Sequence, residues 1–371
     1  MRIAFLSVFY PYRGGIAQFN AHLCEAMGLD GEVRVFNFSR QYPDFLFPGK
    51  TQYVTEQDKA MPVESTRILD SINPFSWRRT AREILRWKPD IVVFSYWMSF
   101  FAPAFGCVAS ALHRRGVKCI TVVHNAIPHE PKFFDKPLAR WFFRKNDLLV
   151  SMCDAVTADI RSLCPDARII QRPHPVYDHF GQKQDKAAAQ AALSLKPGLR
   201  TLLFFGLIRD YKGLDLLIDA LPLLGDGYQL IIAGESYGSF EKYQAQIDAS
   251  GCAGRIHVLN RYIDDEEVPG LFSAADLCVL PYRSATQSGI TAIALHFDLP
   301  LVATPVGGLA ESIERPGIGL MTEAISAEAI ARSIKAFFET GPDTFVENIR
   351  RAKANMTWPA FAETLLAGLS R

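Results

Sequence analysis

The chain has 371 residues, of which 49% are hydrophobic and 21% are charged, and its formal net charge is +1. This composition is typical of a soluble globular protein, and the length is great enough that we expect two domains. The balanced charge excludes a global field that would select nucleic acid or a membrane, although a local basic patch is compatible with it.

In the first half of the chain, short apolar runs predict strands and the stretches between them predict helices. Most of these strands are apolar on both faces, as strands covered by helices on both sides should be. The strands are expected at 2–9, 32–38, 90–97, 118–124 and 148–153, and the helices at 17–28, 75–87, 102–115 and 137–146.

The second half repeats the scheme. Strand alternating with helix predicts parallel sheets, and therefore doubly wound α/β domains. The strands are expected at 201–207, 228–235, 255–262, 276–282 and 300–304, and the helices at 213–223, 239–250, 265–274, 288–297 and 326–340.

A domain boundary is expected within 165–200. The segment PDARIIQRPHPVYDHFG contains three prolines, and DKAAAQAALSLKPG after it predicts a helix that ends at a Pro-Gly stop. This predicts domains at 1–175 and 176–355, with a last helix within 356–371 that could pack on either domain. Two such domains facing each other would leave a cleft between the C-terminal edges of their sheets, where ligand sites are common.

The seven cysteines are scattered, form no CxxC pair and are odd in number, which is typical of reduced thiols in a cytosolic protein. The first apolar run is short and passes straight into a turn, so we expect no signal peptide. We also expect no membrane-spanning helix, because no stretch approaches the roughly 20 apolar residues that one needs.

The first candidate binding site is Arg13-Gly14-Gly15-Ile16, between the first strand and the first helix. Two glycines let the backbone come close to an anionic ligand, and the helix start supplies N–H groups. The pattern is neither GxGxxG nor a Walker motif. A tight connection between the two elements would explain the same glycines.

The second candidate is GLIRDYKG (206–213), which also joins a strand to a helix. Arg209 and Lys212 would lie beside a helix N-terminus, where the dipole disfavours cations unless an anion is near. A bound diphosphate would remove that conflict. The alternative is an exposed loop with two solvated charges.

The third candidate is the loop that leads from the strand at 276–282 into the next helix. Thr286, Gln287 and Ser288 can offer hydroxyls and an amide, and Gly289 can offer a backbone N–H group, to a phosphate or a sugar. Thr286 or Ser288 could instead simply cap the helix.

His124 ends the strand CITVVH at the same kind of sheet edge. A histidine there could hydrogen-bond a sugar hydroxyl or the reacting region, although a single histidine at a strand end is often structural. No cluster such as Asp-x-Asp lies in a suitable loop, so we expect no metal ion.

The segment 131–147, PKFFDKPLARWFFRKND, interleaves five aromatic residues with five cations. A basic, aromatic, amphipathic segment can lie on an anionic membrane surface, and 71–90 has a similar character. Both segments could equally be helices that face the core and expose a solvated basic side.

Taken in order, these motifs resemble GT-B-fold glycosyltransferases, closest to the family-4 retaining enzymes that use nucleotide-diphosphate sugars. The resemblance covers nearly the whole chain and rests on FYPYRGGIAQFNAHL, TVVHNAIPHE, FFGLIRDYKGLDLLIDAL, YQLIIAGE and SAADLCVLPYRSATQSG…LPLVATPVGGLAE. It implies two Rossmann-like domains, the first binding the acceptor and the second the nucleotide sugar, with the last helix packed back on the first.

The resemblance also implies roles for single residues. Gly14 and Gly15 would approach the donor diphosphate, His124 would face the donor sugar, and the nucleobase would pack near Tyr262. Arg209 and Lys212 would stabilise the departing diphosphate.

The sequence departs from the family at two places. Leu207 stands where the family has the arginine of its cationic pair, so Arg209 would reach in from two residues later. The family's Glu-x(7)-Glu pair, which contacts the sugar and the ribose, is replaced by Thr286 and Ala294. Backbone contacts from Ser288, Gly289 and Ile290 to phosphate would survive this loss, because they need no particular side chain.

The function implied by the resemblance is sugar transfer, with retention, to a glycan or lipid-linked acceptor in cell-surface polysaccharide synthesis. The nucleotide-diphosphate sugar is a co-substrate, and neither a cofactor nor nucleic acid is expected. The enzyme would be cytoplasmic, and at the inner face of the membrane if 131–147 binds lipid. A GT-B-fold nucleotide-sugar epimerase and a non-catalytic nucleotide-sugar-binding protein are the alternatives.

Overall fold

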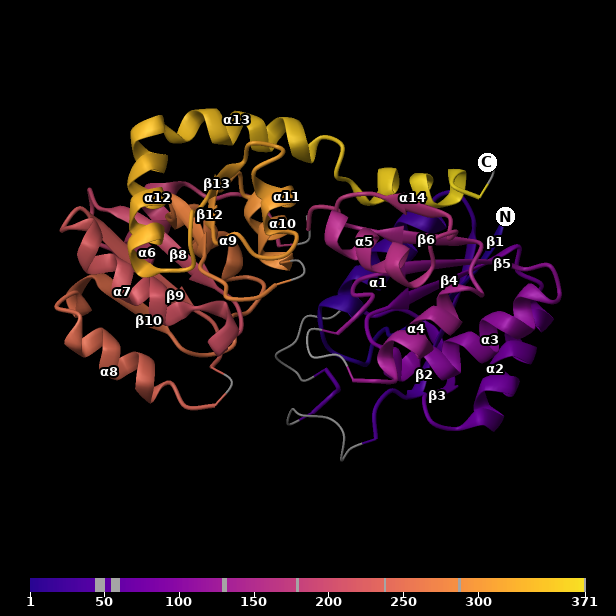
Figure 1. The fold of residues 1–371 in the computed structure, drawn as a ribbon. Coiled ribbons are helices and arrows are strands. Elements are labelled where there is room, and N and C mark those ends of the chain that lie inside the picture. Colours follow the sequence, from indigo (N-terminus) through magenta and orange to yellow (C-terminus); the bar gives the residue numbers. More distant parts are fainter. Residues whose placement is uncertain are drawn as a thin grey trace. The chain divides into compact units, whose positions relative to one another are not determined.

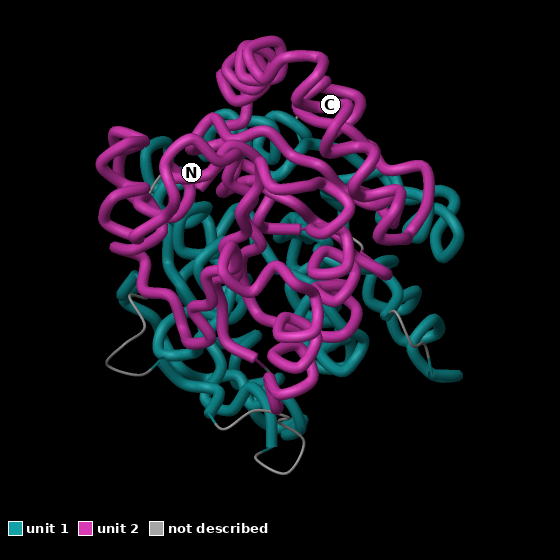
Figure 2. Tube along the Cα trace, turned by 90° about the vertical axis from the view of Figure 1, so that its left-hand side faces the viewer, with its two compact units in different colours: residues 1–174, 357–371 teal, residues 175–356 magenta. Residues whose placement is uncertain are grey.

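The computed structural model describes residues 1–43, 51–54, 61–128, 132–177, 180–236, 238–285 and 288–369. The chain forms two compact units, coloured separately in Figure 2: unit 1 comprises residues 1–174 and 357–371, and unit 2 comprises residues 175–356. Each unit is a parallel sheet flanked by helices (Figure 1). The predicted α/β architecture of two doubly wound domains is therefore confirmed.

Unit 1 contains a sheet of seven strands. They are β1 (Arg2–Leu6), β2 (Glu32–Arg40), β3 (Ser65–Asp70), β4 (Ile91–Tyr96), β5 (Lys118–Val123), β6 (Leu148–Ser151) and β7 (Ile169–Gln171), in the spatial order β3-β2-β1-β4-β5-β6-β7. In the central strand β4 all six side chains are buried, because helices cover both faces of the sheet.

Six α-helices belong to unit 1 within its described residues. They are α1 (Gly15–Gly28), α2 (Pro74–Trp87), α3 (Ala102–His113), α4 (Asp135–Phe143), α5 (Asp154–Leu163) and α14 (Trp358–Ala367). The last helix packs against α1. Gly368 ends it close to the sheet: a Cβ there would lie 2.5 Å from Ile170 and 2.8 Å from Leu148.

Unit 2 contains a sheet of six strands. They are β8 (Arg200–Phe205), β9 (Tyr228–Ala233), β10 (Ile256–Leu259), β11 (Leu277–Leu280), β12 (Leu301–Ala303) and β13 (Gly319–Met321), in the spatial order β10-β9-β8-β11-β12-β13. β8 and β11 are neighbours, with Leu202 opposite Leu277.

The described helices of unit 2 lie before, between and after these strands in the chain. They are α6 (Lys186–Ala192), α7 (Leu214–Leu224), α8 (Glu241–Ala249), α9 (Val268–Ala274), α10 (Gly289–His296), α11 (Leu309–Ile313), α12 (Ala327–Thr340) and α13 (Pro342–Lys353). A 3-10 turn, η3 (Asp210–Lys212), precedes α7. No helix within the described ranges is both long and apolar enough to cross a bilayer.

In both sheets the strand order reverses once. In unit 1 the chain moves outward from β1 to β3 and then returns to place β4 on the other side of β1. In unit 2 it moves outward from β8 to β10 and then returns to place β11 on the other side of β8. Ligands of open parallel sheets bind beyond the carboxyl ends of the strands at such a reversal. The loops after β1, β8 and β11 are therefore the places where a binding site is expected.

All ten predicted strands are present, with ends that differ by up to three residues, but β3, β7 and β13 were not predicted. Helices α5, α11 and α13 were also missed. β7 and β13 have three residues each, as β12 does, but all three residues of β12 are buried, whereas none is in β7 and only Gly319 is in β13. β3 is an edge strand in which only Leu69 is buried, so it lacks the doubly apolar pattern of the others.

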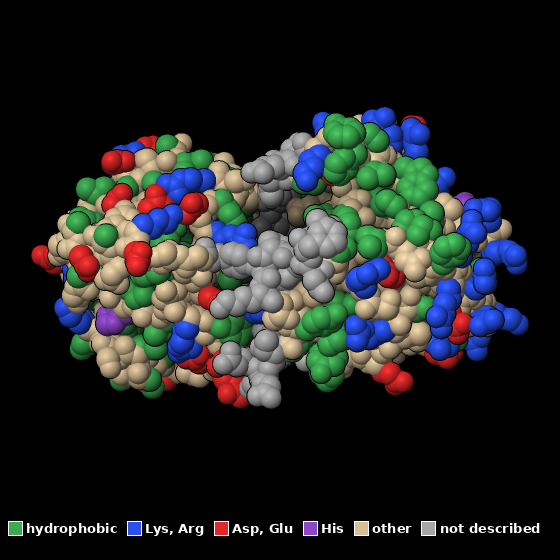
Figure 3. Space-filling view, turned by 90° about the horizontal axis from the view of Figure 1, so that it is seen from below, with side chains coloured by type: hydrophobic (Ala, Val, Ile, Leu, Met, Phe, Trp, Pro, Cys, Tyr) green, Lys and Arg blue, Asp and Glu red, His purple; other side chains and the backbone are tan. Residues whose placement is uncertain are grey.

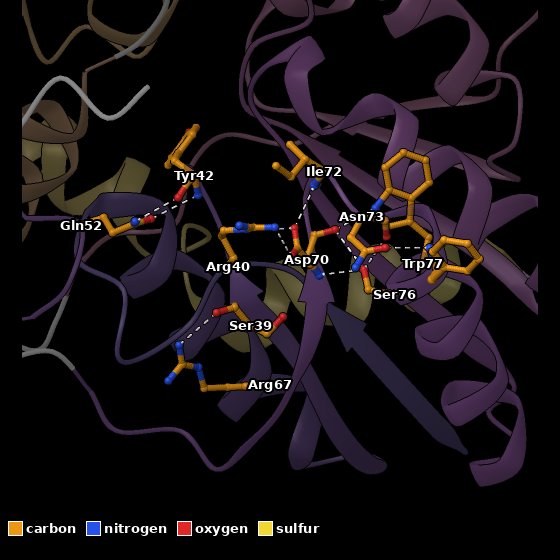
Figure 4. A network of polar contacts seen from close by, with 11 residues as sticks. Ser39, Arg40, Tyr42, Gln52, Arg67, Asp70, Ile72, Asn73, Ser76 and Trp77 are labelled. Carbon is orange, nitrogen blue, oxygen red and sulfur yellow. Dashed lines mark hydrogen bonds and ion pairs between the residues drawn. The ribbon is translucent and has the colours of Figure 1, made fainter. Parts of the chain in front are cut away.

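Because few of its side chains are buried, β3 is held in place by a polar network (Figure 4). Asp70, its last residue, pairs with Arg40 of β2 at 2.5 Å. The Asp70 carbonyl accepts hydrogen bonds from Ser76 Oγ at 3.0 Å and Trp77 Nε1 at 2.8 Å. Asn73 caps α2 by accepting from the N–H of Phe75. These contacts join the edge strand to the start of α2.

Candidate functional site

The loops after β8 and β11 meet at the strand-order reversal of unit 2. Gly206 follows β8, and a Cβ there would lie 3.2 Å from Lys212 Nζ and 3.2 Å from a methyl group of Ile290. Lys212 belongs to the loop after β8, and Ile290 opens α10 after β11. Two stretches that the sequence separates by about 80 residues thus converge on one glycine.

Lys212 is buried, with 8% of its surface exposed, and its Nζ lies 5.6 Å from the centre of the Tyr282 ring. Burial, and then the charge of Arg209, lowers the pKa of Lys212 to about 8. Burial also raises the pKa of the nearby Cys278 thiol to about 12, so this thiol is neutral at physiological pH. Among the described residues no carboxylate pairs with Lys212.

The two carboxylates nearest to Lys212 in the sequence are engaged elsewhere. Asp210 pairs with Lys242, which lowers the pKa of Asp210. Asp215 accepts two hydrogen bonds from Arg283, at 2.7 and 2.5 Å. Burial alone would raise the pKa of Asp215, but Arg283 outweighs it and the pKa is lowered. Both carboxylates are thus paired with other cations, and neither balances the positive charge of Lys212.

Gly213 fixes the end of this loop. Its φ is +64°, and a Cβ there would lie 2.0 Å from the carbonyl oxygen of Pro281. Only glycine fits both the left-handed backbone and the close approach. Gly213 is also the N-cap of α7, so Lys212 lies immediately before a helix N-terminus, where a cation without an anion is unfavourable.

The start of α10 forms the other side of the unit 2 edge. Ser288 is its N-cap residue but makes no capping hydrogen bond through its side chain; Ser288 Oγ lies 3.3 Å from the Tyr282 hydroxyl. The first N–H groups of a helix, here those of Gly289 and Ile290, have no acceptor within it. Thr286 and Gln287 lie outside the described residues.

One polar side chain at this edge, that of Thr291, was not predicted from the sequence. Thr291 is 6% exposed, and its Oγ1 has no hydrogen-bond partner within the described part of the chain. Ala294, one turn further along α10, is fully buried. A threonine in the first turn is unremarkable in a sequence, and only the structure shows that its hydroxyl is unsatisfied.

Tyr262 lies at the same edge of the sheet. The predicted strand 255–262 is too long: β10 ends at Leu259, and Tyr262 is in the loop that follows, half-buried. Its carbonyl accepts from Arg261 at 3.0 Å, and Arg261 pairs through two hydrogen bonds with Glu267, at 2.6 and 2.5 Å. This ion pair ties the loop to the residue before α9.

In unit 1, Gly14 is the N-cap of α1, and Gly15 is the first residue of that helix. Gly14 has φ +119°, a value that side chains rarely adopt. Gly15 has ordinary backbone angles, and a Cβ on either glycine would meet no atom within 4 Å. Within the described residues, neither the backbone nor a neighbouring atom requires residue 15 to be glycine.

His124 follows β5, and its N–H donates to the Tyr96 carbonyl at 2.8 Å. The imidazole packs edge-on against Phe19 of α1, with ring centres 4.8 Å apart. Phe19 in turn packs against Trp358 and Phe361 of α14, at 5.1 and 5.8 Å. The C-terminal helix therefore supports the aromatic surroundings of this histidine.

Those surroundings keep His124 neutral. Burial, and then the charge of His174, lowers the pKa of His124 to about 3. Its Nε2 is shielded from solvent and finds no hydrogen-bond partner among the described residues. A neutral imidazole with an unsatisfied nitrogen suits a contact with a neutral hydroxyl better than one with phosphate.

The predicted site residues therefore fall into two groups. Unit 2 brings Lys212 and Ile290 together at Gly206, with Arg209 close enough to act on Lys212; Gly289 precedes Ile290 at the start of α10. Unit 1 carries Gly14, Gly15 and His124 at its own sheet edge. Within the described ranges, no group of three or more His, Cys, Asp and Glu side chains could hold a metal ion.

The segment 131–147 is described from residue 132. Phe142 and Phe143 of α4 are buried in the core, as expected for a packed helix. Phe133 is 93% exposed, and Trp141 is 38% exposed. The inner side of the segment is thus core, while membrane contact through its outer side stays a prediction.

Two family models match the chain, one in each unit. The model described as glycosyl transferases group 1 matches residues 199–340, and the model described as glycosyl transferase 4-like domain matches residues 14–173. Together the two matches cover more than half of the chain.

Curated relatives are similar over about half of the chain. D-inositol 3-phosphate glycosyltransferase from Mycolicibacterium gilvum is 28% identical over 190 residues, which is 50% of this chain and 43% of the relative. GDP-mannose:glycolipid 4-beta-D-mannosyltransferase from Xanthomonas campestris pv. campestris is 29% identical over 198 residues, which is 52% of this chain and 51% of the relative. The chain therefore spans about half, or less, of these relatives.

Among solved structures, Anabaena Alr3699/HepE in complex with UDP is similar to the whole chain. The TM-score is 0.72 at 17% sequence identity, with 100% of both chains covered. At this identity the similarity shows the fold.

Proposed function

The chain belongs to the glycosyl transferases of group 1 and has the GT-B fold, and from this we propose that it transfers a sugar from a nucleotide-diphosphate sugar to a glycan or lipid-linked acceptor. The single observation that carries the proposal is the buried ammonium of Lys212, which no described carboxylate balances, beside the start of α10. An unpaired buried cation is costly, and an anionic diphosphate would offset that cost.

In this proposal unit 2 holds the donor. Lys212 and Arg209 contact the diphosphate, and the N–H groups of Ser288, Gly289 and Ile290 contact it from the start of α10. Tyr262, two strands away on the same edge, lies beside the nucleobase. Support comes from the Anabaena structure, which contains UDP, and from the position of Lys212 at the strand-order reversal.

Recognition of the sugar and the ribose cannot use the family's carboxylates. The proposal gives this task to Thr286 and Gln287, which lie outside the described residues, and to the unsatisfied hydroxyl of Thr291. Ala294, which stands at the second carboxylate position, is buried and offers no polar group.

The reaction moves the sugar from the diphosphate oxygen to an acceptor hydroxyl, releasing a nucleoside diphosphate and a proton. Negative charge develops on the departing diphosphate while the sugar carbon becomes oxocarbenium-like. Lys212, Arg209 and the N-terminus of α10 stabilise that charge in positions fixed before the reaction, so little reorganisation is needed. The charge is supplied by these residues, and the proposal includes no metal ion. Retention at the sugar carbon is part of the proposal, from the family resemblance.

Unit 1 contributes neutral groups. Gly14 and Gly15 let the backbone approach the donor, and His124 hydrogen-bonds a hydroxyl of the transferred sugar through its unsatisfied Nε2. Because His124 is neutral, it orients the sugar without adding positive charge beside an oxocarbenium-like carbon.

The acceptor is proposed to be a cell-surface glycan or its lipid-linked precursor. The Xanthomonas relative is named for a glycolipid acceptor. We place the reaction at the cytoplasmic side of a membrane, in contact with it through 131–147. All seven cysteines are free thiols, which suits a reducing compartment.

A donor panel tests the proposal. UDP- and GDP-linked sugars are supplied with a lipid extract, and we expect a nucleoside diphosphate to be released as the sugar becomes part of a glycoside. Return of an isomerised but intact nucleotide sugar would instead identify an epimerase, and donor binding without turnover of any sugar would identify a binding protein. Either result overturns the proposal.

A further inference from the structure

The outer side of α4 carries a concave pocket in unit 1. Its volume is about 420 Å³, within the ~300–1,000 Å³ range of small-molecule sites. This α4 pocket is lined by Lys136, Pro137, Arg140, Trp141, Arg144 and Lys145. Four of the six lining residues are cations, and none is acidic.

The helix brings these cations onto one side. Ala139, Phe142 and Phe143 anchor the inner side of α4 in the core. Residues four apart lie one above the other on a helix, so Lys136 and Arg140 form a row that Arg144 continues. Like charges at this spacing repel and destabilise the helix. An anion in the pocket would remove that repulsion.

The acids that flank the row are engaged elsewhere. Asp135 is buried; it accepts from the N–H of Lys132 at 2.6 Å and from the hydroxyl of Ser99. Asp147 pairs with Lys118 at 3.1 Å and accepts from the N–H of Cys119. Across the described chain, none of the four pocket cations forms an ion pair.

Trp141 forms the apolar wall of the pocket, and a glycine makes its position possible. A Cβ on Gly106, in the middle of α3, would lie 2.1 Å from the Trp141 ring. Glycine inside a helix is unfavourable relative to alanine. Because residue 106 is a glycine, the Trp141 ring can lie directly on α3 with part of its surface exposed.

Next to the pocket the chain exposes more aromatic surface. Phe133 is 93% exposed, and its ring packs edge-on against that of Phe134 at 5.2 Å. On the side seen in Figure 3, hydrophobic and basic side chains of unit 1 lie close together. A small soluble anion would contact only the cations. A bilayer surface would contact the cations and the aromatic rings, because aromatic rings are favourable at the interface and cations attract anionic headgroups.

We propose that the α4 pocket binds the phosphate groups of anionic lipids at a bilayer surface. This site is separate from the sugar-transfer residues of unit 2, and it deepens the proposed membrane contact by naming its ligand and residues. The cations contact phosphate oxygens, while Phe133 and Trp141 enter the headgroup region.

Vesicle flotation at low salt tests the proposal. We expect the protein to float with vesicles that contain about 30 mol% phosphatidylglycerol, and to stay behind with phosphatidylcholine alone or at high salt. The double variant Lys136→Gln/Lys145→Gln should bind about 25-fold more weakly, at about fivefold per cation. Phe133→Ser should bind several-fold more weakly. Absence of flotation with anionic vesicles would overturn the proposal.

Matched controls separate the pocket from general charge. Lys335→Gln/Arg351→Gln, on α12 and α13 of unit 2, removes the same charge, and Leu29→Ser removes an exposed apolar side chain elsewhere in unit 1. Neither should change flotation; equal losses in controls and pocket variants would overturn the proposal. Inorganic phosphate at the vesicles' phosphate concentration should not compete, and if it does, the pocket is a site for free anions.

Binding of nucleoside diphosphate reports on the proposed function separately. The double variant Lys136→Gln/Lys145→Gln should bind it as the natural chain does. Loss of flotation with intact nucleotide binding supports the lipid site. If nucleotide binding is absent in the natural chain but flotation persists, the proposed function fails while the lipid site stands.

Discussion

The carboxyl edges of the two sheets share one topology but differ in chemistry. Each lies at a reversal of strand order, β1 beside β4 in unit 1 and β8 beside β11 in unit 2. Unit 2 places a buried cation there, next to the start of α10. Unit 1 places two unobstructed glycines and a histidine among aromatic rings. The two edges thus share a topology, while the residues of their loops give them different chemistry.

Burial lowers the pKa of one side chain at each edge, but it leaves Lys212 charged and His124 neutral. It lowers the pKa of Lys212 from 10.5 to about 8, so the ammonium is still mostly charged at neutral pH. It lowers the pKa of His124 from 6.5 to about 3, so the imidazole is neutral. The same desolvation effect therefore leaves a charged side chain at the edge of unit 2 and a neutral one at the edge of unit 1.

The largest expected effect is that of Lys212→Met. We expect turnover of the donor to fall about 10²–10³-fold, because one preorganised charge is lost from the departing diphosphate. The matched control is Lys335→Met, which removes an exposed lysine of α12 and should leave turnover unchanged. Steady-state kinetics with a turned-over donor make the comparison, and unchanged turnover in Lys212→Met would remove the cation from the mechanism.

The same lysine should make stability depend on pH. Its pKa is lower in the folded than in the unfolded chain, so between about pH 8 and 10.5 the unfolded chain binds more protons, and stability rises with pH. The gain over that window is about 3 kcal/mol. Chemical denaturation of the natural chain and of Lys212→Met measures it: the variant should lack this rise and be at least as stable at neutral pH. A rise of the same size in both would place its origin elsewhere.

A smaller effect is expected for His124→Phe. The ring shape is kept and the hydrogen bond to the sugar is lost, which should lower turnover about 10-fold. Because the pKa of His124 is about 3, turnover should show no histidine titration between about pH 5 and 7. A pH profile with a step near 6.5 that disappears in the variant would show that His124 becomes charged. That result would contradict the assignment of a neutral imidazole to the edge of unit 1.

Gly15→Ala should weaken donor binding without changing the fold. A Cβ there meets no atom within 4 Å, so the melting temperature should not change. Weaker donor binding by about 10-fold is expected if the backbone approaches the diphosphate. Gly28→Ala, at the other end of α1 and equally unobstructed, is the control. Equal donor binding in both variants would mean that residue 15 does not touch the donor.

Much of this molecule could be predicted from the sequence, because buried parallel strands leave doubly apolar runs. The strands that were missed either have a polar pattern, as in β3 with its Asp70 network, or are short and only partly buried, as in β7 and β13. Glycine-rich and cationic loops after strands also pointed to Gly15 and Lys212, since position along the chain fixes which sheet edge they occupy.

What the sequence could not show depends on contacts between distant residues. Nothing in the sequence around Lys212 indicates that Asp210 pairs with Lys242 and Asp215 with Arg283. These ion pairs leave Lys212 without a carboxylate partner among the described residues. The unsatisfied hydroxyl of Thr291 is likewise invisible before the chain is folded.

Calorimetric titration with UDP and GDP tests the central claim, that unit 2 holds a diphosphate through Lys212. The natural chain should bind one of them at neutral pH and more weakly at about pH 9.5, where Lys212 has lost its proton. Lys212→Met should bind about 100-fold more weakly at neutral pH, and with little change between the two pH values. Equal affinity of the natural chain and Lys212→Met would contradict the account.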